Sequence, residues 1–247
     1  MVKDYNQFHY TKEGFLKYFL KGALLGGGIG FLFYSNLFGV VLSFPIGLIY
    51  VHGKKKDLIE GRKWQLNLEF RDGLASLSAA LNAGYSVENA FYQAVLDLKL
   101  MYSVDSLIVT EFEGIVKQIQ MNQNIEEILE EFAVRTGIED IENFAEVFKT
   151  AKRTGGDIIH IIRTSGNTIH DKIEVKREIR TLITGKKFEA NIMSVIPMGI
   201  ILYLRLCSPA FLEPLYHNLF GFVFMTILLI VYYGVYLLSK KIMNIKI

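Results

Sequence analysis

The sequence predicts an all-α membrane protein in which two transmembrane helical hairpins flank a cytoplasmic six-helix bundle. The first observation is that the apolar residues of this 51% hydrophobic chain are concentrated in two regions, and a bilayer core accepts only helices or closed barrels. The second is that the charged stretch between them has apolar side chains at helical spacing and almost no strand pattern. We therefore expect a cytoplasmic N-terminal segment, a first hairpin, the bundle, a second hairpin and a cytoplasmic tail at residues 1–18, 19–51, 52–188, 189–238 and 239–247.

Each apolar region divides into two predicted spans, and a span needs about 20 apolar residues. The first region gives two short spans, Phe19–Tyr34 and Leu37–Val51, with a turn at Ser35-Asn36. The second region gives Ala190–Leu206 and Leu219–Leu238. Four spans place both termini on the same side of the membrane.

Basic residues at the ends of the spans predict the orientation. Lysines precede the first and third spans and follow the second and fourth, whereas the two connecting loops carry no Lys or Arg apart from Arg205. By the positive-inside rule, the termini and the central segment are cytoplasmic. Arg205 is either an intramembrane charge that lines a pathway or a terminal arginine that reaches the outer headgroups.

Small residues recur every fourth position in the first two spans. This spacing puts them on one helix face, where they let two backbones approach closely, and it predicts a tightly packed antiparallel pair. The residues are Gly22, Gly26 and Gly30 in the first span, and Gly39, Ser43 and Gly47 in the second.

Six amphipathic helices are predicted between the hairpins. Their apolar stripes cover residues 66–81, 87–98, 108–119, 125–132, 141–151 and 158–173. Ser86, Asn124 and Asp157 stand where helices begin, and Glu127 lies three residues after Asn124, as in a capping box. Glycines close the helices and shape the turns between them, at Gly84, Gly137, Gly155 and Gly156.

No motif for catalysis or for cofactor binding is present. The sequence lacks a Walker motif, a GxSxG and a GxGxxG after a strand. The lone His160 and His170 have no ligand cluster around them, and the single cysteine, Cys207, excludes an intrachain disulfide. With a net charge of +2 there is also no argument for nucleic-acid binding. We therefore expect a protein that is not an enzyme and has no metal site or cofactor.

Charge is distributed unevenly along the central segment. Basic residues gather near the membrane ends, where they fit anionic lipid headgroups. Acidic residues cluster further along the chain, with only Arg135 against them, and serve either to dock a basic partner or to keep the bundle soluble. The acidic residues considered for partner contact are Glu126, Glu127, Glu130, Glu131, Glu139 and Asp140.

The order of these turns resembles the type II secretion system F-domain family. The resemblance is carried by the run from Phe70-Arg71-Asp72-Gly73-Leu74 to Leu81-Asn82-Ala83-Gly84-Tyr85-Ser86, and by Arg135-Thr136-Gly137 with Gly155-Gly156-Asp157. It covers nearly the whole chain and is closest to the TadB-like or TadC-like platform proteins of tight-adherence (Flp-type) pili. One departure is the turn Met121-Asn122-Gln123-Asn124, where the family commonly has a glycine; Asn tolerates the left-handed conformation.

The resemblance implies a non-enzymatic platform protein of the bacterial inner membrane, with both termini in the cytoplasm. Such a protein couples a cytoplasmic assembly ATPase to the extraction and polymerisation of pilin subunits, and it pairs with itself or with a paralogue. Arg71 and Asp72 join the acidic residues as candidate contacts with the ATPase. The alternative is a membrane-anchored regulator, or a small transporter, with a cytoplasmic helical sensing domain.

Overall fold

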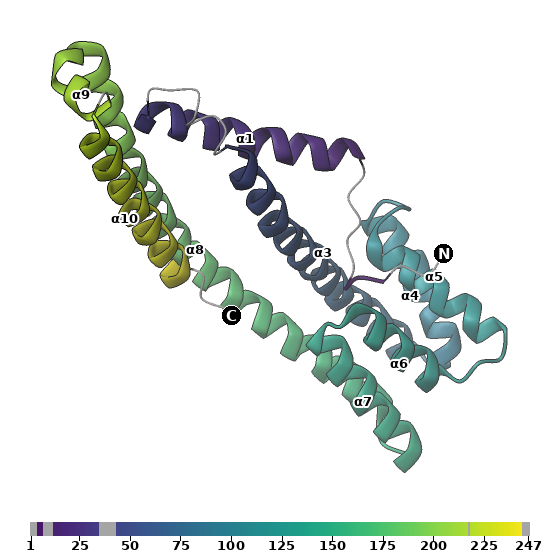
Figure 1. Cartoon of the computed structure of the whole chain (residues 1–247). Helices are drawn as coiled ribbons and strands as arrows, with labels where there is room; N and C mark the ends of the chain where they lie inside the picture. The colour runs from purple at the N-terminus through teal and green to yellow at the C-terminus, as the bar shows by residue number, and fades with distance from the viewer. Residues whose placement is uncertain (1–3, 7–11, 35–42, 217, 244–247) are drawn as a thin grey trace. The chain divides into compact units, whose positions relative to one another are not determined.

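The described part of the chain is built from helices. The computed structural model describes residues 4–6, 12–34, 43–216 and 218–243 (Figure 1). It is 89% helical and has no strand among these residues, which confirms the all-α class. The helices are α1 (Lys12–Tyr34), α3 (Ser43–Asn82), α4 (Val87–Met101), α5 (Leu107–Gln120), α6 (Ile125–Thr136), α7 (Glu139–Thr154), α8 (Ile158–Cys207), α9 (Pro209–Tyr216) and α10 (Leu219–Met243).

The chain divides into two units. The first unit comprises Met1–His9 and Lys56–Val175, and the second comprises Tyr10–Lys55 and Lys176–Ile247. Both boundaries fall inside helices, because α3 and α8 each contribute residues to both units. The first unit also includes residues 4–6, which the sequence predicts as part of a separate cytoplasmic N-terminal segment.

The first unit has one hydrophobic core that joins α3, α4, α5, α6, α7 and the start of α8. Phenylalanine rings lie at its centre: the Phe70 ring centroid is 5.5 Å from that of Phe144 and 6.0 Å from that of Phe132. In sequence order α4 packs against α5, and α6 packs against α7. The core therefore consists largely of the apolar stripes that the periodicity predicts.

Several helices of the first unit are capped by residues that lie next to the helix end in sequence. The Ser86 hydroxyl accepts a hydrogen bond from the Asn89 amide, and the Asp157 carboxylate accepts one from the His160 amide at 2.9 Å. Gly84, Gly137 and Gly155 have positive φ angles of 91°, 54° and 72°, a conformation that costs glycine little. The Gly156 amide donates to the Ala151 carbonyl at 2.8 Å, which completes the end of α7.

The capping box predicted at the start of α6 is not formed. The Asn124 side chain caps no backbone amide of the helix. Its Nδ2 donates instead to the Glu127 carboxylate at 3.2 Å. At the preceding turn Asn122 has φ 59° and occupies the left-handed region, which asparagine tolerates better than most residues.

Three helices of the described chain are long and apolar enough to cross a membrane. They are α1, α8 and the Leu219–Ser239 part of α10, and they contain the first, third and fourth predicted spans. The turn at Ser35-Asn36 and residues 37–42 of the second predicted span lie outside the described residues. The described remainder of that span belongs to α3.

In the second unit α1 packs closely against the start of α3. Gly22, Gly26 and Gly30 are all buried. A Cβ atom added at Gly22 would lie 2.8 Å from the Tyr50 Cβ and 3.0 Å from the Gly47 Cα. Glycine is required there because the two backbones meet. Gly39 and the side chain of Ser43 lie outside what the structure describes.

The C-terminal end of α1 is held by side chains from α8 and α9. Arg205 donates from Nη1 to the Phe31 carbonyl at 2.9 Å, and its guanidinium lies 4.2 Å from the Phe31 ring centroid. Tyr216 donates to the Leu32 carbonyl at 2.8 Å. The last carbonyls of a helix have no partner within it, so Arg205 makes a structural contact that neither sequence interpretation included.

Candidate interaction site

The acidic residues of α6 are largely paired within the first unit. Lys152 Nζ lies 2.8 Å from Glu126 Oε2, and Lys149 Nζ lies 2.6 Å from Glu130 Oε2. Partial burial acts to raise the pKa of Glu126, but the hydrogen bond and positive charge of Lys152 outweigh it and lower the pKa. The expectation that Arg135 alone opposes this cluster is therefore wrong, because lysines of α7 lie against it.

The other predicted contact residues divide between the surface and the interior. Glu127, Glu131 and Glu139 are exposed, and the Glu131 carboxylate lies 3.9 Å from Arg135 Nε. Asp140 is only 9% exposed, and its two oxygens accept hydrogen bonds from Asn67 at 2.8 Å and Lys172 at 2.6 Å. Its hydrogen bond raises the pKa of Lys172. Asp140 thus joins α7 to α3 and α8, while the three glutamates face outwards.

Arg71 and Asp72 form a local pair that is also tied to the next helix. Arg71 Nη2 lies 2.8 Å from Asp72 Oδ1, and the Tyr102 hydroxyl donates to Asp72 Oδ2. Burial, reinforced by this hydrogen bond, raises the pKa of Tyr102. The two charged side chains are only partly exposed, so the pair joins α3 to the end of α4.

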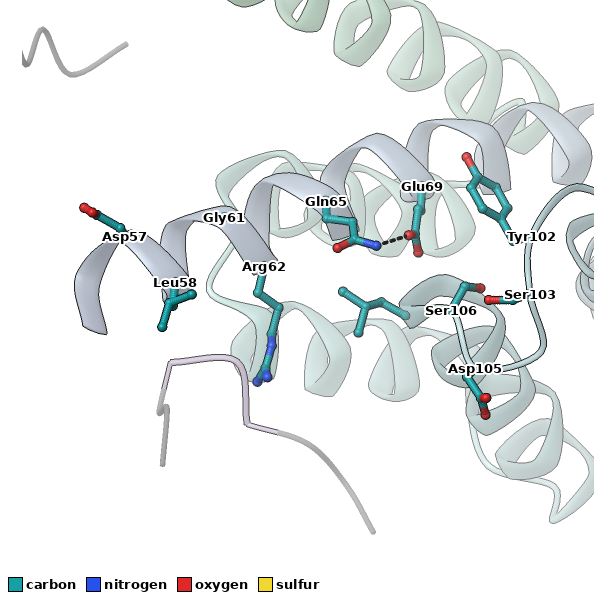
Figure 2. Close-up of a pocket in the computed structure, with 11 residues that line it drawn as sticks. Asp57, Leu58, Gly61, Arg62, Gln65, Glu69, Tyr102, Ser103, Asp105 and Ser106 are labelled. Carbon is teal, nitrogen blue, oxygen red and sulfur yellow. Dashed lines mark hydrogen bonds between the residues drawn. The ribbon is translucent and has the colours of Figure 1, made fainter. Parts of the chain in front are cut away.

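A groove of about 630 Å³ runs between α3 and the turn that joins α4 to α5 (Figure 2). Gln65 donates to the Glu69 carboxylate at 2.9 Å, and the other Glu69 oxygen accepts the Ile108 amide at 3.0 Å. The Ile108 amide belongs to the first turn of α5, where backbone amides lack partners within the helix. Buried Glu69 therefore serves as a cap for α5, and its hydrogen bonds explain why a carboxylate lines this groove.

A buried polar cluster connects the start of the chain with α5 and α6. The Tyr5 hydroxyl donates to Glu111 Oε1 at 2.7 Å, and Arg135 Nη2 lies 2.8 Å from Glu111 Oε2. The Tyr5 amide donates to the Arg135 carbonyl at 3.2 Å. Tyr5 is 1% exposed and Glu111 is 6% exposed. The cluster is not predictable from the sequence, because Tyr5 is more than a hundred positions from Glu111 and Arg135 and the three residues share no motif.

The same segment reaches the turn at Gly137. Lys63 donates from Nζ to the Asn6 side chain at 2.6 Å and to the Gly137 carbonyl at 3.0 Å. A Cβ atom added at Gly137 would lie 2.7 Å from the Asn6 Oδ1. Gly137 is therefore both a helix end and part of the surface that receives residues 4–6.

No group of three or more His, Cys, Asp and Glu side chains that could hold a metal ion occurs within the described ranges. In comparisons with known proteins, no family model, curated protein or solved structure matches the chain.

Proposed function

We propose that the chain is an inner-membrane platform protein of a type II secretion or type IV (Flp/Tad) pilus assembly machine. In this role it couples a cytoplasmic ATPase to the extraction and polymerisation of pilin subunits. One observation carries the proposal: α3 and α8 each contribute residues both to the charged helical unit and to the unit with the apolar helices. A protein that transmits work across a membrane surface needs such continuous elements.

The order of the turns supports the same proposal. The turns at Gly84, Gly137 and Gly155 lie between helices whose apolar faces share one core, in the order that the F-domain resemblance requires. The two-hairpin topology, the six-helix bundle and the cytoplasmic position of both termini belong to this proposal. The flanking lysines support the orientation, because the positive-inside rule places them in the cytoplasm.

Arg205 gives no support to a transporter. Intramembrane charges that line a pathway face a water-filled cavity or a partner charge. Arg205 instead binds a backbone carbonyl of α1 and covers an aromatic ring. We therefore retain the platform function and, within it, propose that the exposed acids Glu127, Glu131 and Glu139 contact the ATPase.

Co-purification tests the platform function directly. A tagged full chain, extracted from its native host in mild detergent, is expected to retain a secretion-type ATPase identified by mass spectrometry. Replacing the three exposed acids by lysine should reduce ATPase recovery, because the partner surface would then meet like charge. The matched control is Glu113→Lys, which reverses a partly exposed acid on α5.

Two outcomes would contradict these proposals separately. If the wild-type chain retains no such ATPase while its pilus or secretion phenotype is intact, the platform function is wrong. If the ATPase is retained equally by the wild type and by the triple variant, only the docking surface is wrong.

A further inference from the structure

Helix α4 is apolar on two opposite sides. Tyr92, Leu96 and Leu100 follow one another at a spacing of four and are 47%, 41% and 89% exposed. At 100° per residue they lie opposite the residues that α4 buries in the core, namely Ala90, Phe91, Ala94, Val95 and Leu98. A helix that is apolar all round is normally covered on all sides. We call Tyr92, Leu96 and Leu100 the outer face of α4.

Two more apolar side chains are exposed next to α4. Tyr85, just before the helix, is 46% exposed, and Val104, just after it, is 66% exposed. Scattered single apolar residues on a surface need no explanation, whereas a row of them along one helix face marks an interaction site. The outer face of α4 is such a row.

The acidic side chains of α4 and of the turn after it form no ion pair within the described part of the chain. No other described residue forms an ion pair with Glu88, Asp97 or Asp105. The one basic residue of α4, Lys99, lies 2.6 Å from Glu113 of α5 and is thereby neutralised. This is the reverse of α6, whose Glu126 and Glu130 are matched by lysines of α7.

We propose that the outer face of α4 docks a basic amphipathic helix of a partner protein. The apolar side of that helix would cover Tyr92, Leu96 and Leu100, and its Lys and Arg residues would pair with Glu88 and Asp97. Helix-in-groove and helix-on-helix recognition use the same spacing of three and four residues. The inference does not depend on the platform function, because it concerns a different face of the first unit.

The same charges argue against a second copy of the chain and against an anionic membrane surface as the occupant of this face. A second copy would bring identical acidic rims together, and the one basic residue of α4, Lys99, is already paired with Glu113. Like charges across an interface are costly. An anionic membrane surface would likewise repel Glu88, Asp97 and Asp105, whereas it attracts clusters of Lys and Arg. Charge complementarity therefore favours a basic partner.

Site-directed photo-crosslinking in the native host tests the proposal with the full chain. Benzoylphenylalanine is placed at Leu100, and a matched control carries it at Val134, which is 70% exposed on α6. We expect the Leu100 position alone to crosslink to one protein segment, which mass spectrometry identifies as an amphipathic helix rich in Lys and Arg. A synthetic peptide of that segment should bind the full chain in zwitterionic nanodiscs.

Charge reversal then distinguishes a specific docking site from nonspecific apolar binding. Glu88→Lys with Asp97→Lys should weaken peptide binding by about tenfold or more, because each rim charge would then oppose the peptide. Crosslinks to lipid, to a second copy, to a segment without basic residues or to nothing at all would overturn the proposal. Equal labelling at Val134, or peptide binding unaffected by the reversal, would overturn it too.

Discussion

Glu111 is a carboxylate in the core of the first unit, and two partners compensate for the cost of burying it. Burying an unpaired carboxylate costs several kcal/mol, so a carboxylate that is 6% exposed needs compensation. Arg135 supplies two hydrogen bonds, at 3.2 and 2.8 Å, and Tyr5 supplies a third at 2.7 Å. Tyr5 is therefore part of the core, and its backbone amide binds the Arg135 carbonyl next to the Gly137 turn.

Removal of Arg135 tests how much Glu111 depends on it. Arg135→Met keeps the packing of the aliphatic part of the side chain and leaves Tyr5 as the partner of Glu111. We expect a loss of about 3 kcal/mol in the local opening free energy of α5 and α6, since breaking a buried pair leaves an uncompensated charge. The measurement is hydrogen–deuterium exchange on the full chain in detergent. The double variant with Glu111→Gln should recover much of the loss, and equal losses in both variants would contradict the pairing.

Tyr5 makes the first unit sensitive to alkaline pH. Burial, together with the neighbouring Glu111 carboxylate, raises the pKa of Tyr5 above its ordinary value. The unfolded chain releases the phenol proton near pH ~10, while the folded chain retains it. The contribution of the Tyr5 phenol to the free energy of unfolding is therefore fully present below about pH 10, and it falls as the pH rises further.

This loss of stability at alkaline pH can be measured by comparing the wild type with Tyr5→Phe. We expect the thermal unfolding midpoint of the wild type to fall more steeply from pH 9 to 11 than that of Tyr5→Phe. Tyr102→Phe should flatten the profile as well, because burial and its Asp72 hydrogen bond raise the pKa of Tyr102. Parallel profiles for the wild type and Tyr5→Phe would show that the Tyr5 phenol is not buried against a carboxylate.

At the scale of elements, the predictable features are those that arise within a few residues. Ser86 and Gly137 mark helix ends because a capping hydroxyl and a left-handed glycine act locally. The pairing of Glu130 with Lys149, and of Tyr5 with Glu111, depends on which helices become neighbours. No spacing rule in the sequence specifies that. For the same reason all four acids of α6 are predicted as partner contacts, whereas the structure pairs Glu126 and Glu130 with lysines of α7.

The contact between α1 and α3 predicts different effects for two neighbouring glycines. Gly22→Ala would place a methyl group 2.8 Å from the Tyr50 Cβ, whereas a Cβ atom at Gly28 meets nothing within 4 Å. Both changes bring the same gain in helix propensity, so the difference between them isolates the packing. We expect Gly22→Ala to be less stable than Gly28→Ala by about 1–3 kcal/mol, measured as thermal stability in detergent. Equal stability would contradict the close approach.

At the scale of the whole molecule, the two units differ in what their surfaces expose. The second unit exposes large apolar side chains along α8 and α10, among them Val195, Tyr203, Phe220 and Ile230. Exposing such apolar side chains to water is unfavourable, whereas contact with lipid chains is not. The first unit exposes mainly polar and charged side chains, and its outer α4 face is a row of exposed apolar ones. The second unit thus exposes the kind of surface that suits lipid, and the proposed docking face of α4 lies on the first unit.

The proposed orientation places Cys207 and the first unit on opposite sides of the membrane. Cys207 is the one cysteine of the chain and is exposed at the end of α8, next to a connecting loop without lysine. We expect a membrane-impermeant maleimide to label Cys207 in intact spheroplasts. In a Cys207→Ser background, Ser103→Cys in the turn after α4 should be labelled only after permeabilisation, because the proposed orientation puts that unit in the cytoplasm. Labelling of both positions under the same condition would contradict the topology, and with it the platform function, since an assembly ATPase reaches only the cytoplasmic face.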